Sequence, residues 1–330
     1  MQESIIKIND RLYGEADLEP VLTDLIRSKA VQRLKGIHQD GASFLVNPAW
    51  NISRCEHSIG VMLLIRRLGG SLEEQIAGLL HDVSHTAFSH AADDVFNMEN
   101  EDYHEQMFRQ WVKQSDISGI LHTYGFHDED ILYDEQKWTL LEQPAPSLCA
   151  DRIDYTLRDS LAYGFGDPVE IGRFLETGLT VAEGEICCTS AEHAEWFARL
   201  YYQEVIDFFM NPLNIYALCT LSQMLKEALD MRVIAGRDFF KTDTELLAML
   251  KQKARFRETL VKLSTASKRV KQGDEGDFTF HQTLKVRWID PKVAVNGRKI
   301  PASTLSKNVL LMKETAIAAM KKGAYVKAAQ

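Results

Sequence analysis

Four residues in the range 57–151 carry the chemistry that is most visible in this sequence: His57, the adjacent pair His81 and Asp82, and Asp151. Neutral imidazoles and carboxylates bind the same borderline-to-hard divalent ions. Each of the four lies beside apolar, helix-forming sequence, where a buried charge is costly unless a partner neutralises it. The set therefore predicts a site for one divalent metal ion, and Mn, Fe, Mg, Zn, Ni and Co are all compatible with such ligands.

Further histidines follow the His81–Asp82 pair closely. His85 and His90 lie within the next eight residues, and His104 is an additional candidate, although the whole chain has only 10 histidines. Consecutive residues diverge by about 100° on an ideal helix, so His81 and Asp82 can reach one ion only near a helix end. The segment 83–86 is a suitable helix exit, and we expect the pair to lie there.

The helix predicted over residues 147–161 has a polar face. Its members recur at three- and four-residue steps, the spacing of one helical face, and they are Asp151, Asp154, Tyr155, Arg158 and Asp159. A solvated surface is the ordinary interpretation of such a stripe, but a tyrosine is unusual on an exposed charged face. We therefore expect this helix to line a polar active site.

The elements that must position these residues are mostly helical. Apolar residues recur at helical spacing from about residue 20 to 265, and helices are predicted at 57–68, 71–80, 102–114, 147–161, 190–209, 213–231 and 243–263. Ser71 is expected to cap the second of these, with Glu74 completing a capping box. A short strand is expected near the N-terminus, at Ile5, Ile6 and Ile8.

The pattern changes after Lys271. Residues 273–277 predict a loop, residues 278–295 are rich in β-forming types, and Asn296-Gly297 is a strong hairpin turn signal. A final helix is predicted at 308–322. We therefore expect a mainly α fold, with a helical domain at 1–265 and a small basic α+β region at 266–330.

Charge is distributed unevenly along the chain. The net charge is -9, yet residues 251–330 hold 18 Lys and Arg against 6 Asp and Glu. The acidic remainder argues against a long nucleic-acid-binding surface on the main domain. The basic C-terminal region could bind nucleic acid, a nucleotide effector or the acidic body of another subunit, although a solvated surface or an internal contact with the acidic body is the simpler interpretation.

Composition is that of an ordinary soluble globular protein, with 45% hydrophobic and 26% charged residues. No signal-peptide pattern and no apolar run of membrane-spanning length occurs. The five cysteines have no regular spacing, which is typical of reduced thiols. These features predict a cytoplasmic protein without a membrane partner.

Short motifs follow one another in a characteristic order over residues 5–165. They are Gln32-Arg33-Leu34, a Pro-containing turn ending at Asn47-Pro48, Arg54-Cys55-Glu56-His57-Ser58-Ile59-Gly60, His81-Asp82-Val83-Ser84-His85-Thr86-Ala87-Phe88-Ser89-His90, His104-Glu105, and Asp151-Arg152-Ile153-Asp154-Tyr155-Thr156-Leu157-Arg158-Asp159. This order resembles the HD-domain metal-dependent phosphohydrolases, and within them the deoxynucleoside triphosphate triphosphohydrolases. The resemblance implies a helical HD core whose signature spans about residues 30–165.

Specific roles are implied by this resemblance. The catalytic metal would be held by His57, His81, Asp82 and Asp151. The scissile phosphate would be surrounded by charge stabilisers or proton donors, namely Arg54, His85, His90 and His104. The sugar would be approached by Gln39, Tyr155 and Asp159, and a phosphate by Arg152. The implied enzyme hydrolyses a deoxynucleoside triphosphate (dNTP) to deoxynucleoside and tripolyphosphate, and it forms dimers or higher homo-oligomers.

One departure from the triphosphohydrolase pattern keeps alternatives open. Enzymes of that branch usually carry basic residues on a helix after the core, whereas residues 200–225 contain no Lys, Arg or His. An HD phosphatase acting on nucleoside monophosphates or other phosphate esters is therefore a second hypothesis. A third is a non-catalytic nucleotide-binding regulatory module, and a fourth is di-iron oxygenase chemistry, for which His85 and His90 would supply a second metal site.

Overall fold

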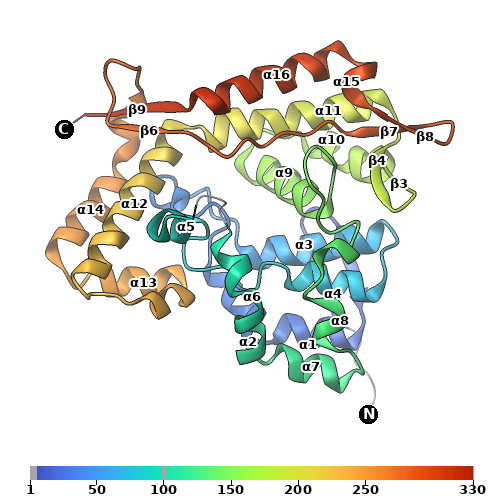
Figure 1. Cartoon of the computed structure of the whole chain (residues 1–330), viewed down its shortest axis with the longest axis horizontal. Coiled ribbons are helices and arrows are strands. Elements are labelled where there is room, and N and C mark those ends of the chain that lie inside the picture. The colour runs from blue at the N-terminus through green and yellow to red at the C-terminus, as the bar shows by residue number, and fades with distance from the viewer. Residues whose placement is uncertain (1–5, 99–101, 330) are drawn as a thin grey trace.

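The computed structural model describes residues 6–98 and 102–329, and helices make up most of this part of the chain (Figure 1). The helices of the first half are α1 (Pro20–Arg27), α2 (Lys29–Arg33), α3 (Arg54–Arg67), α4 (Leu72–Leu80), α5 (Ala91–Phe96), α6 (Tyr103–Gln114), α7 (Ile117–Thr123), α8 (Asp128–Ile131) and α9 (Ala150–Tyr163). Those of the second half are α10 (Pro168–Arg173), α11 (Ala191–Gln203), α12 (Pro212–Asp230), α13 (Asp243–Leu250), α14 (Ala254–Ser264), α15 (Ala302–Leu305) and α16 (Lys307–Lys322).

Several shorter helices connect these elements. The 3₁₀ helices are η1 (Leu34–Gly36), η2 (Ser43–Leu45), η3 (Glu135–Lys137), η6 (Gly236–Phe240) and η7 (Ala266–Lys268), and two π-helical turns are η4 (Phe174–Gly178) and η5 (Glu204–Phe209). The η5 turn continues α11 directly, so the helix predicted at 190–209 is one continuous helix with a π-helical end. The helix predicted at 243–263 is two helices, α13 and α14, separated at residues 251–253.

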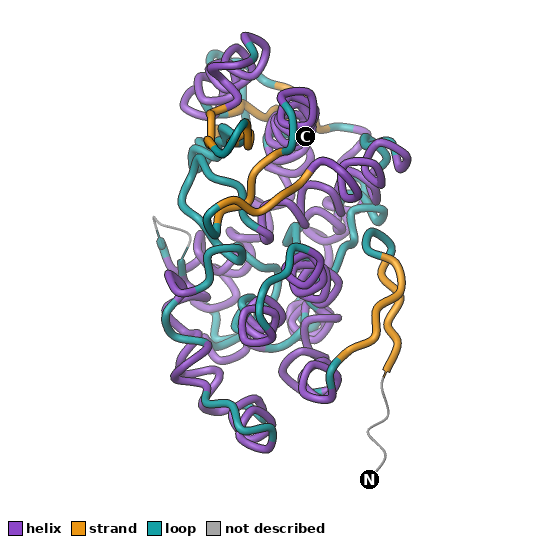
Figure 2. Tube along the Cα trace, turned by 90° about the vertical axis from the view of Figure 1, so that its right-hand side faces the viewer, coloured by secondary structure: helices purple, strands orange, loops and turns teal. Residues whose placement is uncertain are grey.

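The strands form three small sheets. An antiparallel hairpin pairs β1 (Ile6–Asp10) with β2 (Gly14–Leu18) and lies along one edge of the helical body (Figure 2). A mixed sheet has the order β3 (Leu179–Ala182), β4 (Glu185–Cys188), β7 (Lys292–Val295) and β8 (Arg298–Pro301). A third has the order β5 (Val270–Gln272), β9 (Ala324–Ala328) and β6 (Phe280–Gln282). The predicted N-terminal strand is confirmed from Ile6 onward, and Ile5 lies outside the described residues.

Helix starts and stops near the site follow from local sequence. Ser53 and Glu56 form a capping box at the start of α3, three residues before the predicted start at His57. Ser71 caps α4 as expected, but the predicted capping box is wrong, because the Glu74 carboxylate accepts a hydrogen bond from the Leu140 backbone N–H at 2.7 Å. Glu74 thus ties α4 to a distant loop instead of to its own N-cap.

The β-rich C-terminal segment is only partly strand. The hairpin at Asn296-Gly297 is confirmed, with φ values of +49° and +74° joining β7 to β8. Residues 283–291, between β6 and β7, run extended without pairing to a sheet, and we call residues 283–287 the strap. The final helix, α16, begins one residue before its predicted start.

Two hydrophobic clusters hold the molecule together. The first centres on α3 and α4, where Gly78 allows close packing against the Ile65 side chain. The second surrounds α12. C-terminal residues contribute to both, Met320 to the first and Val326 to the second. The fold is therefore mainly α with small sheets, and the predicted division at residue 265 stays a prediction.

None of the helices in residues 6–98 and 102–329 combines the length and the apolar character that crossing a bilayer requires.

Candidate functional site

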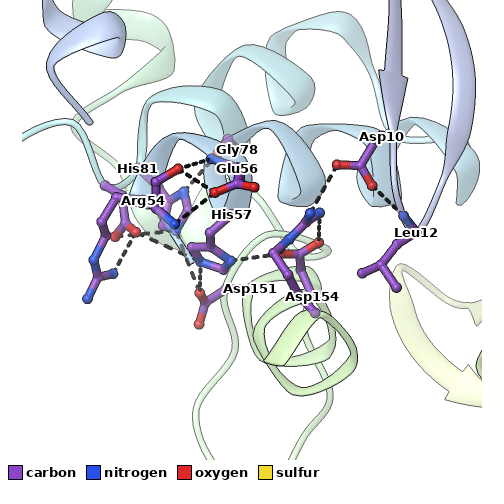
Figure 3. A network of polar contacts seen from close by, with 12 residues as sticks. Asp10, Leu12, Arg54, Glu56, His57, Gly78, His81, Asp151 and Asp154 are labelled. Atoms are coloured by element: carbon purple, nitrogen blue, oxygen red, sulfur yellow. Dashed lines mark hydrogen bonds and ion pairs between the residues drawn. The ribbon is translucent and has the colours of Figure 1, made fainter. Parts of the chain in front are cut away.

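The four predicted metal ligands converge at one point. His57 lies on α3, His81 is the C-terminal cap of α4 with Asp82 directly after it, and Asp151 lies in the first turn of α9. The Asp151 Oδ1 atom is 2.9 Å from His57 Nε2 and 3.6 Å from His81 Nε2, and Asp82 Oδ2 is 3.8 Å from His57 Nε2 (Figure 3). The predicted position of the His-Asp pair at a helix end explains how both side chains reach this point.

His81 is oriented for a cation. Its Nδ1 atom is 2.8 Å from the Gly78 carbonyl oxygen, which fixes the ring so that Nδ1 carries the proton. The Nε2 atom is buried and has no hydrogen-bond partner among the described residues. A buried nitrogen lone pair beside two carboxylates is the arrangement that a divalent ion satisfies. The residues present therefore fit the predicted metal.

His57 is held from its other side by Asp154. The Asp154 Oδ2 atom lies 2.8 Å from His57 Nδ1, and both Asp154 oxygens accept hydrogen bonds from Arg158 at 2.9 Å. Burial by itself would lower the pKa of His57, but hydrogen bonds with Asp151 and Asp154 overcome it and raise that pKa to about 9. A metal ligand must be deprotonated, so metal binding displaces this proton.

The N-terminal hairpin completes this support. Tyr13 donates its hydroxyl to Asp154 Oδ1 at 2.9 Å, and Asp10 accepts from Arg158 at 3.0 Å. The other Asp10 oxygen accepts the backbone N–H groups of Leu12 and Tyr13, at 2.8 and 3.1 Å, which fixes the carboxylate in the turn. The hairpin thus reaches His57, a predicted metal ligand, through Arg158 and Asp154.

Gly60 makes this network possible. It lies on α3 one turn after His57, and a Cβ atom there would overlap the Arg158 guanidinium and the Asp154 carboxylate. Glycine is therefore required because α9 places two charged side chains against the α3 backbone. The burial of Asp154 and Arg158, with exposed fractions of 0% and 5%, also confirms that the polar face of α9 is not a solvated surface.

Arg54 lies on the opposite side of the ligand cluster. Its Nη1 atom is 2.6 Å from Asp82 Oδ2, its Nε–H donates to Ser89 Oγ at 3.0 Å, and Nη2 donates to the Gln39 carbonyl at 3.3 Å. Burial would raise the pKa of Asp82, but the charge of Arg54, together with His81 and His85, outweighs it and holds that pKa well below its usual range. Asp82 is therefore an ionised carboxylate shared between Arg54 and the metal position.

The three remaining predicted histidines form a cluster next to Asp82. His85 stacks on His104 with ring centroids 3.8 Å apart, and His90 lies 5.1 Å from His85 edge-on. Burial, with a smaller contribution from the charge of His90, lowers the pKa of His104 to about 3. Burial and the charge of Arg54 hold the pKa of His85 well below its usual range. Both rings are neutral near pH 7.

This cluster also bears on the di-iron alternative. Ligand atoms of Asp82, His85 and His104 lie within 4.8 Å of one another, which is close enough for a second ion. However, the Arg54 guanidinium already forms an ion pair with Asp82 at 2.6 Å, and a second cation would face its positive charge. The geometry therefore favours one metal position, between His57, His81 and Asp151, with Asp82 beside it.

A cavity of about 770 Å³ opens at the ligand cluster. Gln39 and Tyr155 line it, in agreement with their predicted role near a substrate, and Phe108, Leu132 and Trp138 form an apolar wall. Arg152 and Asp159 are not among its described lining residues. The Arg152 Nη1 atom donates to the Ser147 carbonyl at 2.5 Å, so its predicted phosphate contact stays a prediction, as does the sugar contact of Asp159.

Asp159 belongs to a buried acidic group that the sequence motifs do not indicate. Burial and the neighbouring carboxylates of Asp40 and Glu204 hold the pKa of Asp159 well above its usual range. Burial also raises the pKa of Glu204 to about 8 and that of Asp40 to about 6. Tyr163 donates its hydroxyl to Asp40. This group is therefore partly protonated near neutral pH.

Other supporting residues were outside the reach of sequence reasoning. The sequence places Asp154 and Arg158 on the polar face of the helix predicted at 147–161, and spacing from His57 gives no signal for their contact with it. Asp10 and Tyr13 are far away in sequence. Lys285 and Arg287, which also line the cavity, were included only in the general charge excess of the C-terminal region.

Comparison with known proteins places this geometry in a family. An HD-domain family model matches residues 54–159, which include the four ligands. The metal-dependent phosphohydrolase cns2 of Cordyceps militaris is 32% identical over 312 residues, covering 92% of this chain and 89% of that protein. The uncharacterized protein YdhJ of Bacillus subtilis is 51% identical over 324 residues, covering 98% and 99%.

Two further similarities are more distant. The deoxynucleoside triphosphate triphosphohydrolase SAMHD1 of Bos taurus is 29% identical over 227 residues, covering 53% of this chain and 38% of that protein. A crystal structure of a hypothetical protein from Aquifex aeolicus shares the fold, with a TM-score of 0.70, 22% identity, and coverage of 95% of this chain and 99% of that one. From the near full-length match to cns2 and the HD-domain match over the ligand region, the chain belongs to the HD-domain metal-dependent phosphohydrolases.

Proposed function

We propose that this chain hydrolyses deoxynucleoside triphosphates to the deoxynucleoside and tripolyphosphate. The observation that carries the proposal is the convergence, in one cavity, of the metal ligands with Arg54 and the histidine cluster of His85, His90 and His104. A phosphate bound there would meet cationic, donor and proton-transfer groups together. The partial similarity to SAMHD1, whose name gives this activity, supports the choice of substrate.

The overall reaction balances as a hydrolysis. Water adds to the α-phosphorus, the bond from that phosphorus to the 5′ oxygen breaks, and the 5′ oxygen takes a proton. His57, His81, Asp82 and Asp151 would hold a divalent ion, which would supply positive charge at the phosphate and lower the pKa of water toward neutrality. Asp154 and the Gly78 carbonyl fix the two ligand imidazoles, so that the site is organised before substrate binds.

The chain's own side chains then act on the phosphate. Arg54, held by Asp82 and Ser89, presents a guanidinium whose planar donors match phosphate oxygens. His85 and His104 are neutral rings that can accept or donate a hydrogen bond. Asp93 holds His90 through its Nδ1 atom at 2.9 Å, which leaves Nε2 of His90 for proton transfer.

A second candidate function is the hydrolysis of nucleoside monophosphates or other phosphate esters. It is favoured by the wall formed by η5 and α12, where the lining residues Phe209, Asn214, Ile215 and Leu218 carry no positive charge. A monophosphate needs no cation beyond the metal and Arg54. The predictions of a homo-oligomer and of a nucleotide effector or nucleic acid at the C-terminal region remain predictions.

The test is hydrolysis of the four dNTPs and the matching monophosphates with Mn, Mg, Fe or Co added, and with the phosphate product identified. We expect tripolyphosphate from the wild type and loss of at least about a hundredfold in rate for His81→Ala. His122→Ala, which changes a half-exposed histidine away from the cavity, is the matched control. Orthophosphate from monophosphates, with dNTPs intact, would replace the first candidate by the second.

A further inference from the structure

The cavity is rich in acidic side chains. Its described lining residues include seven Asp or Glu side chains, among them Asp40, Asp82, Asp93 and Glu142, whereas the lining Lys and Arg residues are Arg54, Lys285 and Arg287. Arg54 is already paired with Asp82 beside the metal position. A polyphosphate entering this cavity therefore needs positive charge beyond the ligand cluster, because like charges in a partly enclosed site repel strongly.

The strap supplies the two other Lys and Arg residues that line the cavity. Lys285 and Arg287 come from the extended segment that runs from β6 to β7 beneath α16 (Figure 1), and both line the cavity. The Arg287 guanidinium lies 5.7 Å from the Phe209 ring centroid, and that ring lies 6.4 Å from the ring of Tyr155 on α9. Tyr155 is one helical turn from Asp151, so this path connects the strap to the metal ligands.

Both ends of the strap are held firmly. On one side β6 pairs with β9, and on the other Tyr202 accepts the Ile289 N–H at 3.2 Å and donates its hydroxyl to the Ile289 carbonyl at 2.6 Å. Between them, the Arg287 N–H contacts Met320 Sδ at 3.2 Å. The cations are thus presented on a segment of defined course, not on a free tail.

Three other lysines of the C-terminal region are not among the described lining residues of the cavity. Lys292 and Lys299 pair with the Glu185 carboxylate of β4, and Lys313 pairs with Asp290 at 2.9 Å. These pairs attach the region to the body of the molecule. The positive charge that the sequence shows after residue 250 is therefore divided between lysines that pair with the body of the molecule and the two strap residues that line the cavity.

We propose that Lys285 and Arg287 of the strap bind the distal phosphates of a nucleoside triphosphate and make this enzyme selective for a polyphosphate tail. The inference rests on the proposed function, whose substrate class it specifies. It also accounts for the absence of Lys, Arg and His from residues 200–225, because the strap beside that segment, with Arg287 next to Phe209, carries the charge instead. The two residues are specificity-determining side chains and take no part in bond cleavage.

The kinetic test compares the metal-loaded full-length protein with Lys285→Ala, Arg287→Ala and Arg287→Lys. For each alanine variant we expect kcat/KM for a dNTP, relative to that for the matching monophosphate, to fall about tenfold, mainly through KM, because each variant loses a charge-assisted hydrogen bond. Arg287→Lys keeps the charge and should recover part of the loss. Lys321→Ala, an exposed lysine of α16 away from the cavity, is the control with an unchanged ratio.

A binding measurement separates this inference from the proposed function. Inorganic tripolyphosphate is titrated into the wild type and the variants by calorimetry, which requires no turnover. An affinity about tenfold weaker in both alanine variants supports the strap as the tail-binding element, even if the wild type cleaves only monophosphates. Equal tripolyphosphate affinity in all variants, or equal losses with triphosphate and monophosphate, would overturn it.

Discussion

Replacing Asp154 by asparagine tests whether the buried network behind His57 serves the metal site. The Asp154 carboxylate accepts four hydrogen bonds, from His57 at 2.8 Å, from Tyr13 at 2.9 Å, and from two nitrogens of Arg158 at 2.9 Å. Asparagine keeps the size of the side chain, but it has one acceptor oxygen and a donor NH₂ group that must face another donor. The change therefore removes a charge and disturbs the ligand ring without creating a cavity.

Two separate losses follow. Residues that orient metal ligands typically contribute about 10- to 100-fold in metal affinity, which corresponds to about 1.4 to 2.7 kcal/mol. Stability also falls, because Arg158 is left buried with Asp10 as its remaining acidic partner at 3.0 Å. Breaking a buried ion pair costs about 3–5 kcal/mol, and we expect about 3 kcal/mol because Asp10 stays in place.

Metal affinity is measured by calorimetric titration of Mn²⁺ into metal-free protein, and stability by urea unfolding of the same samples. Tyr13→Phe is the matched control, since it removes one hydrogen bond to Asp154 and leaves every charge in place. We expect it to cost about 1 kcal/mol of stability and to change metal affinity less than about threefold. If Asp154→Asn unfolds more easily yet binds Mn²⁺ as tightly as the wild type, Asp154 supports the fold and not the metal site.

Three further results are expected. Between pH 4.5 and about 8 the folded protein retains a proton on Glu204 that the unfolded chain releases, so stability should decline with rising pH in that window by up to about 1.4 kcal/mol per pH unit. Urea unfolding at pH 6 and 8 should show a smaller decline for Glu204→Gln than for the wild type. An equal decline in both proteins would contradict the assignment of Glu204 as a buried, protonated acid. Gly60→Ala should cost about 1–3 kcal/mol in thermal or urea unfolding. Gly119→Ala, which lies in α7 with open space around it, should be neutral or stabilising by up to about 1 kcal/mol. A similar loss for both would contradict the close approach of α9. Removal of the metal by a chelator should abolish activity. Addition of a divalent ion at a hundred times its Kd should then stabilise the wild type by about 2.7 kcal/mol and leave His81→Ala unchanged. An equal shift in the unfolding temperature of both proteins would place the ion elsewhere.

The clustering of the predicted ligands and most helices could be predicted because they depend on local rules. Helical spacing of apolar residues reports the buried side of each helix, and Ser71 and Asn296-Gly297 act through hydrogen bonds and backbone angles within a few residues. Histidine and aspartate motifs also indicate a metal site whatever the fold, because few partners other than a metal ion compensate for the burial of such groups. The position of the His81–Asp82 pair at a helix end followed from these signals, and the family followed from the resemblance of the ordered motifs.

Long-range contacts had no comparable signal in the sequence. Glu74 had the spacing of a capping box, yet its carboxylate binds a backbone N–H 66 residues away, because the packing of α4 brings that loop within reach. The support of His57 by Asp154, Arg158 and the β1–β2 hairpin arises from the close approach of α3 and α9. The strap reaches the cavity because β6 and β7 belong to different sheets at either end of it. Residue types and local spacing thus specify the chemistry of this protein. The packing of distant segments specifies which side chains share the cavity, because hydrogen bonds and charges act over a few ångströms in space, whatever the separation along the chain.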